Sequence, residues 1–116
     1  MNSSAASPKL PDWFQYPAEI IKIRVLGLLN LQPWVVLDDE RIASRFDGLR
    51  ERYSSRELIP FARREDNDDV ACWEKGKEPK VVVIHDFASP GYENVAEFDD
   101  FWAWFRSAIE EMIAFE

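Results

Sequence analysis

Apolar residues follow a helical period in two stretches of the chain, one before the middle and one at the carboxyl end. The first stretch predicts a helix that Asp38 or Asp39 caps. Its apolar stripe runs at i, i+4, i+7 and i+11 through Ile42, Phe46, Leu49 and Tyr53. The arginines of this segment lie off the stripe: Arg41, Arg45, Arg50, Arg52 and Arg56.

The second stretch predicts a helix that opens with a capping box formed by Asn94 and Glu97. One face of this helix carries Phe98, Phe101, Trp102, Phe105, Ile109 and Met112. Three further apolar residues, Trp104, Ile113 and Phe115, fall away from that face and widen the apolar surface.

Shorter apolar segments have the length and composition of strands, and they cover residues 34–37, 58–61, 70–73 and 81–87. The connection over residues 74–80 contains Gly76 and Pro79 and is short enough for an antiparallel hairpin. Another helix is expected to start at Pro17 and to stop at Gly27. Helices at both ends of an antiparallel meander predict an α+β fold, with a central, mainly antiparallel sheet flanked by helices.

Length and composition indicate one folded domain. The 116 residues, 47% of them apolar, can fill a single core over residues 10–116. Residues 1–9 are small and polar and predict a frayed tail. They lack the apolar region of a secretory signal. No stretch approaches the roughly 20 apolar residues that a membrane helix needs. The single cysteine, Cys72, excludes an internal disulfide and favours the cytoplasm as the compartment. The sequence does not determine the oligomeric state.

The acidic residues are concentrated in the second half of the chain. Residues 1–64 hold ten Lys and Arg against eight Asp and Glu, whereas residues 65–116 hold four against fourteen. The halves therefore carry +2 and −10, and a field of this sign repels nucleic acid and anionic membranes and attracts basic proteins. Acidic surfaces also keep domains in solution without any partner, so this simpler interpretation stays open.

Four carboxylates, Glu65, Asp66, Asp68 and Asp69, crowd between the expected strands over residues 58–61 and 70–73. This acidic loop is the main candidate site. Asp66 and Asp68 have the first spacing of an EF-hand, but Val70 stands at the next ligand position and Lys77 at the closing one, so this calcium loop is excluded. Mutual repulsion of the carboxylates leaves three explanations open: a cation held by irregular ligands, a basic partner, or plain solvation.

No catalytic signature stands out. His85 is the only histidine, and on a strand it would share a face with Val81, Val83 and Phe87, as a packed side chain hydrogen-bonded to a neighbour, while Asp86 points the other way. A buried Cys72 would be inert. We therefore predict a protein that is not an enzyme, with no catalytic residues, metal ligands or cofactor.

Aromatic residues near carboxylates suit a protein interface, because Trp and Tyr supply contact area while charge fixes the orientation. Trp73, Tyr92 and Trp104 are the candidates for partial exposure near carboxylates, and a core role is the default interpretation for each of them. The predicted partner-binding residues are Glu65, Asp66, Asp68, Asp69, Trp73, Glu74 and Tyr92.

Several segments together resemble the SUKH superfamily, which joins bacterial toxin-immunity proteins to a yeast regulator of cell-wall assembly. They are Leu10-Pro11 with Trp13-Phe14, residues 58–62, the acidic loop, Val70-Ala71-Cys72-Trp73, residues 83–87, and Phe98-Asp99-Asp100-Phe101 at the start of the last helix. The resemblance covers about residues 10–110. Members of that superfamily usually carry a helix before the Leu-Pro segment, where this chain has nine mostly polar residues.

The resemblance implies an α+β fold and a protein that acts by binding. Bacterial members neutralise a cognate toxin, often a nuclease, and a nuclease must be basic to hold its substrate, which suits an acidic inhibitor. The expectation is an immunity protein that binds a basic toxin domain. Two alternatives stay open, a regulatory or scaffold domain without a toxin partner and a metal-dependent enzyme that uses the acidic loop.

Overall fold

The structure is a computed structural model that describes residues 10–116, so the predicted tail over residues 1–9 lies outside the described part. The elements follow in the order α1 (Ala18–Val25), β1 (Asn30–Leu31), β2 (Trp34–Val36), α2 (Asp39–Arg52), β3 (Leu58–Arg64), β4 (Asp69–Glu74), β5 (Val81–His85), β6 (Asn94–Phe98) and α3 (Phe101–Ala114).

All six strands form one sheet in chain order, and each neighbouring pair is antiparallel. This meander, with its helices, confirms the predicted α+β class. Apart from the connection between β2 and β3, which contains α2, short connections let consecutive strands pair. The predicted hairpin over residues 74–80 joins β4 to β5. In that hairpin Gly76 has φ of +86°, a conformation that favours glycine.

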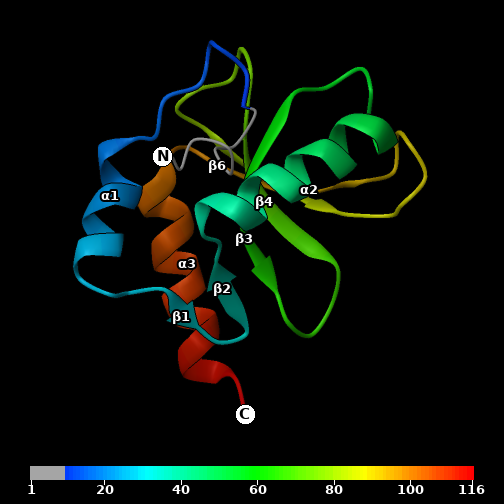
Figure 1. Ribbon diagram of the computed structural model, residues 1–116. Coiled ribbons are helices and arrows are strands. Elements are labelled where there is room, and N and C mark those ends of the chain that lie inside the picture. The colour runs from blue at the N-terminus through cyan, green and yellow to red at the C-terminus, as the bar shows by residue number, and fades with distance from the viewer. Residues whose placement is uncertain (1–9) are drawn as a thin grey trace.

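Two apolar clusters lie on the two faces of the sheet. Along β4, Ala71 and Trp73 join the larger cluster, while Val70 and Cys72 join the smaller one. The helices α1 and α3 cover the larger cluster, and α2 lies in front of β3 and β4 in Figure 1. The four stripe residues, three in α2 and its C-cap Tyr53, are all buried, with the first two in the larger cluster and the last two in the smaller one.

The beginnings and ends of the first two helices agree with the sequence. Pro17 precedes α1 as its N-cap, and Gly27 follows it with φ of +72°. The carboxylate of Asp38 accepts a hydrogen bond from the backbone N–H of Arg41 at 2.9 Å and so caps α2.

The predicted start of the last helix is wrong. Residues Asn94–Phe98 form the edge strand β6, so Asn94 and Glu97 make no capping box, and α3 begins at Phe101. Asp100 caps α3 by accepting a hydrogen bond from the N–H of Ala103 at 2.8 Å. The physical reason is that β6 pairs with β5 over its length, which local side-chain signals do not reveal.

Two of the tryptophans that were candidates for partial exposure, Trp73 and Trp104, follow the default interpretation and belong to the core. Trp104 is 1% exposed and Trp73 is 3% exposed. Both pack on Phe61, with ring centroids at 4.9 and 4.4 Å, because α3 turns Phe101, Trp104 and Ala108 toward the sheet. Apart from Phe101, the residues of the face predicted from the sequence are only half-buried.

Candidate functional site

The acidic loop, residues 65–68, connects β3 to β4, and its carboxylates do not all face solvent. Asp66 turns back onto Arg64, whose Nε and Nη2 donate hydrogen bonds of 2.8 and 2.9 Å to its two oxygens. This guanidinium holds the pKa of Asp66 below its ordinary value. Arg64 also bonds Glu111 of α3, which accepts a second hydrogen bond from the indole of Trp34. One arginine therefore ties the loop to α3.

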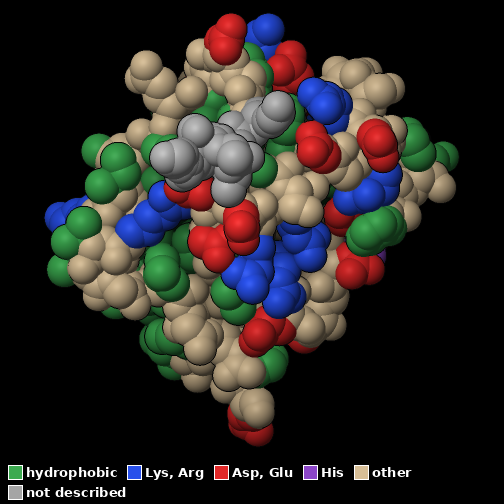
Figure 2. Space-filling view, viewed as in Figure 1, with side chains coloured by type: hydrophobic (Ala, Val, Ile, Leu, Met, Phe, Trp, Pro, Cys, Tyr) green, Lys and Arg blue, Asp and Glu red, His purple; other side chains and the backbone are tan. Residues whose placement is uncertain are grey.

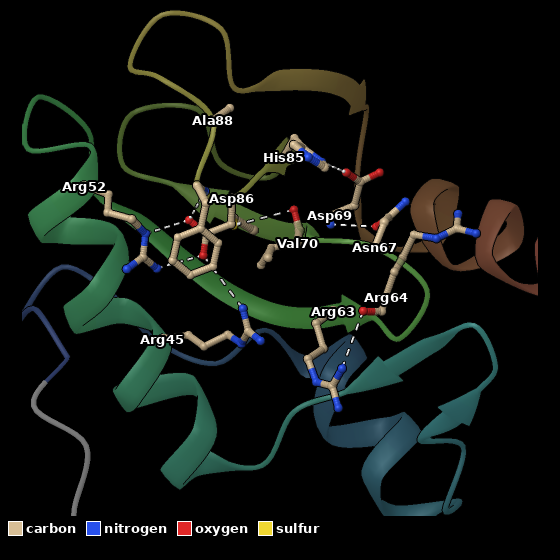
Figure 3. Close-up of polar contacts among 12 residues, drawn as sticks. Arg45, Arg52, Arg63, Arg64, Asn67, Asp69, Val70, His85, Asp86 and Ala88 are labelled. Carbon is tan, nitrogen blue, oxygen red and sulfur yellow. Dashed lines mark hydrogen bonds and ion pairs between the residues drawn. The ribbon is translucent and has the colours of Figure 1, made fainter.

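Asp69 opens β4 and pairs across the sheet with His85 at the end of β5. The two side chains meet with 2.8 Å between Nδ1 and Oδ1, as Figure 3 shows. Hydrogen bonding to Asp69, with the added charges of Asp68 and Asp86, raises the pKa of His85. The predicted packed histidine is wrong, because His85 is half-exposed and β5 ends there, although the predicted hydrogen bond to a neighbour is present.

Asp86 is buried on the α2 side of the sheet. Its two oxygens accept hydrogen bonds of 2.8 Å each from Arg52, and Arg45 lies 3.8 Å away. The next residue, predicted to continue the strand, is instead in a turn: Phe87 has φ of +70°, is 64% exposed, and lies under the Arg52 guanidinium at 4.2 Å. Figure 3 shows Arg45 and Arg52 extending from α2 toward Asp86.

Trp73 and Glu74 lie at the end of β4 away from the acidic loop, and both are buried. Trp73 is part of the aromatic core, and Glu74 is 9% exposed. Arg56 bonds Glu74 through two hydrogen bonds of 2.9 and 2.8 Å and also reaches Glu93 at 2.8 Å. These carboxylates raise the pKa of Arg56. Both residues are therefore corrected from interface to interior.

Arginines from the first half of the chain form ion pairs with acids of the second half, an arrangement that the sequence pattern did not predict. The pairs join Arg64 to Asp66 and Glu111, Arg52 and Arg45 to Asp86, and Arg56 to Glu74 and Glu93. Figure 2 accordingly shows basic and acidic side chains interspersed over α2 instead of a patch of one sign. A sequence signal existed, because Arg45 and Arg52 are seven residues apart and so share one helix face.

What stays exposed forms a smaller set than predicted. Glu65 and Asp68 are exposed and make no ion pair within residues 10–116. Tyr92 is 83% exposed, and Phe87, which the sequence assigned to a strand, joins it on the same β5–β6 loop. We call these four residues, Glu65, Asp68, Phe87 and Tyr92, the loop-end surface.

The two loops of this surface are fixed to each other and to α2. The backbone N–H of Asp86 donates to the carbonyl of Asp68 at 2.9 Å, and the Tyr53 hydroxyl donates to the carbonyl of Ala88 at 2.8 Å. The ion pairs of Asp69 with His85 and of Asp86 with Arg52 add to these bonds. All of them fix the backbone of the two loops that carry the exposed side chains. Such an arrangement can bind a surface.

Cys72 is fully buried, and burial raises the pKa of its thiol. Within residues 10–116 no three His, Cys, Asp or Glu side chains converge as metal ligands, and no helix there is long and apolar enough to cross a membrane. Comparison of the chain with protein-family models found no match, and comparisons with curated proteins and with solved structures found none either.

Proposed function

We propose that this chain is a SUKH-like immunity protein that neutralises a basic toxin domain by binding it through the loop-end surface. The observation that carries this proposal is the pairing state of the acidic loop. Glu65 and Asp68 make no ion pair within the described residues, while their neighbours Asp66 and Asp69 are paired with Arg64 and His85. The exposed, unpaired carboxylates of Glu65 and Asp68 are therefore available to a cationic partner.

Rigidity favours this use of the two loops. Binding is weakened by the entropy lost when flexible loops become ordered, and loops already held by hydrogen bonds lose less. The contacts of Asp68 with Asp86 and of Tyr53 with Ala88 tie both loops to the sheet and to α2. The loop-end surface is therefore preorganised.

Its composition suits a protein partner. Phe87 and Tyr92 offer exposed aromatic area, and aromatic residues with charges around them supply much of the affinity and the orientation of protein complexes. The net charge of −8 repels nucleic acid and attracts a basic protein from a distance. A nuclease toxin has the required positive charge, and the resemblance to immunity proteins points to the same class.

The test is binding to the product of the neighbouring reading frame, coexpressed with this chain and purified. If that product is a basic toxin domain, the double variant Glu65→Lys and Asp68→Lys is expected to weaken the complex about tenfold to a hundredfold at low salt, measured by calorimetry. Tyr92→Ser is expected to weaken it at low and at high salt, because the lost contact is apolar.

The matched control is the double variant Asp12→Lys and Glu51→Lys. It changes the net charge by the same amount at exposed carboxylates that make no ion pair within residues 10–116. Binding equally weak in both double variants would mean that only net charge matters, and an unchanged complex in the first would disprove the proposed surface. A neighbouring frame that encodes no toxin would favour the regulatory or scaffold alternative.

A further inference from the structure

The last strand of the sheet, β6, has a neighbour on one side only. It pairs with β5 and ends the strand order, and within residues 10–116 no strand pairs with its outer edge. Asn94, Val95, Ala96 and Glu97 are all exposed, Val95 by 52%. Every second residue of such an edge directs its backbone N–H and C=O groups away from the sheet, so these groups can pair with another chain.

The opposite edge of the sheet is better protected. Strand β1 has only two residues, and Leu31 is 3% exposed. Proteins blunt an exposed edge by keeping it short or by adding Lys, Pro, charges or a bulge. The five residues of β6 include no Lys or Pro; they carry a bulge at Val95 and one charge, Glu97, but Ala96–Phe98 stay in regular register with β5. Strand β6 is therefore the edge that can accept a further strand.

The surface is hollowed on both sides of this edge. On the side of α2, a hollow of about 530 Å³ is lined in part by Val82 and Glu97. On the side of α3, a hollow of about 200 Å³ is lined in part by Val83, Ala96 and Phe98. Val82 and Val83 belong to opposite apolar clusters, so the two hollows lie on opposite faces of the sheet. Successive side chains of an added strand point to opposite faces and so meet the two hollows in turn.

The charge of the edge disfavours a second copy of the chain and favours a basic segment. Residues 93–100 hold four Asp and Glu and no Lys or Arg. Two copies of β6 side by side would bring carboxylates together, and like charges on paired strands are destabilising. Lys80 lies 3.3 Å from Glu97, but both side chains are about half exposed, and such a pair contributes little. Asp99 is exposed and makes no ion pair within the described part of the chain.

We propose that β6 is a docking edge to which an extended segment of the partner, with Lys or Arg alternating with apolar residues, adds as a further strand. This inference rests on the function proposed above, because the basic toxin domain supplies the segment. Its cationic side chains meet Glu97 on the side of α2, and its apolar side chains meet Ala96 and Phe98 on the side of α3. Strand β6 continues directly from the loop that carries Phe87 and Tyr92 (Figure 1), so one partner can contact the loop-end surface and β6 together.

The edge is tested first without the partner, on the whole chain labelled with ¹⁵N. The probe is a peptide of about eight residues in which Lys and Val alternate, long enough to form one strand. The expected result is a saturable shift of the backbone amide resonances of residues 94–98, with slower hydrogen exchange of the amides that face outward. A peptide that alternates Lys with Gly has the same charge but little strand propensity, and one that alternates Glu with Val has the opposite charge. Neither of these should give the result.

Val95→Lys places a charge at the outer edge and is expected to weaken binding of the Lys-Val peptide at least severalfold. The matched control is Val25→Lys on α1, the same change at a side chain that is 80% exposed, which should leave binding unchanged. If Val95→Lys does not fold, the three peptides decide alone. The variant Glu65→Lys with Asp68→Lys should still bind the peptide at β6, so failure of the loop-end surface and failure of the docking edge are separate results.

The absence of a saturable shift, or an equal shift with the Lys-Gly or the Glu-Val peptide, would overturn the proposal. Self-association of the chain through β6, detected by sedimentation, would overturn it too, because the occupant would then be a second copy. In a purified complex with the toxin domain the outward amides of β6 should be protected from exchange. A complex that forms and leaves their exchange unchanged would show that the partner adds no strand.

Discussion

The buried pair of Asp86 and Arg52 is expected to be the main electrostatic support of the β5–β6 loop, and Asp86→Asn tests it. Asparagine keeps the shape and the acceptor for the Phe87 N–H, which the carboxylate holds at 2.8 Å. It removes the charge and turns an amide toward the Arg52 guanidinium. The side chain of Asp86 is fully buried, so the loss is not screened by water.

The loss of stability expected for Asp86→Asn depends on how deeply the ion pair is buried. Breaking a buried ion pair by removing one partner costs about 3–5 kcal/mol, but Arg52 is 32% exposed and can be partly hydrated, so we expect about 2–3 kcal/mol. For a domain of this size that corresponds to a fall of roughly 10 °C in the melting temperature. Urea unfolding should show the change as a shifted midpoint with an unchanged slope.

The matched control is Asp47→Asn on α2, the helix that carries Arg52. Asp47 pairs with Arg50 at 3.3 Å, but both side chains are more than half exposed, so the expected loss is below about 0.5 kcal/mol. A double-mutant cycle with Arg52→Met, which keeps an unbranched aliphatic side chain and removes the guanidinium, should give a coupling of about 1–2 kcal/mol between Arg52 and Asp86. Equal losses for Asp86→Asn and Asp47→Asn, or zero coupling, would refute the reasoning.

Two further predictions concern groups whose pKa the fold shifts. Since folding raises the pKa of His85, the stabilisation from its pair with Asp69 is complete below the unfolded value near 6.5 and disappears as pH rises through the folded value. The stability difference between the wild type and His85→Gln, from urea unfolding, should therefore be larger at about pH 5.5 than at about pH 8.5, and a reversed order would contradict the pair. Cys72 should react with a thiol reagent only as fast as the protein opens, because its thiol is buried and its pKa raised, and rapid labelling of the native protein would contradict this burial.

The parts of the fold that the sequence predicted are those with local signals. The stripe of α2 and its cap at Asp38 depend on residues within a few turns of one another, so periodicity locates them. The strand β6 has almost no buried residue, and only pairing with β5 makes it a strand. In α3 nearly every side is apolar, so the pattern could not decide that Trp104 faces the sheet.

The candidate site was predicted less completely, for a physical reason. The sequence located the acidic loop, but whether a carboxylate is free depends on arginines far away in the chain. Arg64 reaches Glu111 across 47 positions, and Arg52 reaches Asp86 across 34. Phe87 was missed because its positive φ is set by the turn that follows Asp86 and not by its residue type.

The charge split along the chain acts differently at long and at short range. Five of the fourteen carboxylates in residues 65–116 (Asp66, Glu74, Asp86, Glu93 and Glu111) are bound by arginines of the first 64 residues. This pairing leaves the net charge at −8, so long-range attraction of a basic partner persists. Direct contacts, however, are restricted to carboxylates that the fold leaves free, such as Glu65 and Asp68. Rising salt should therefore slow association with a basic partner while the arginine pairs that hold the loops, being partly buried, are screened much less.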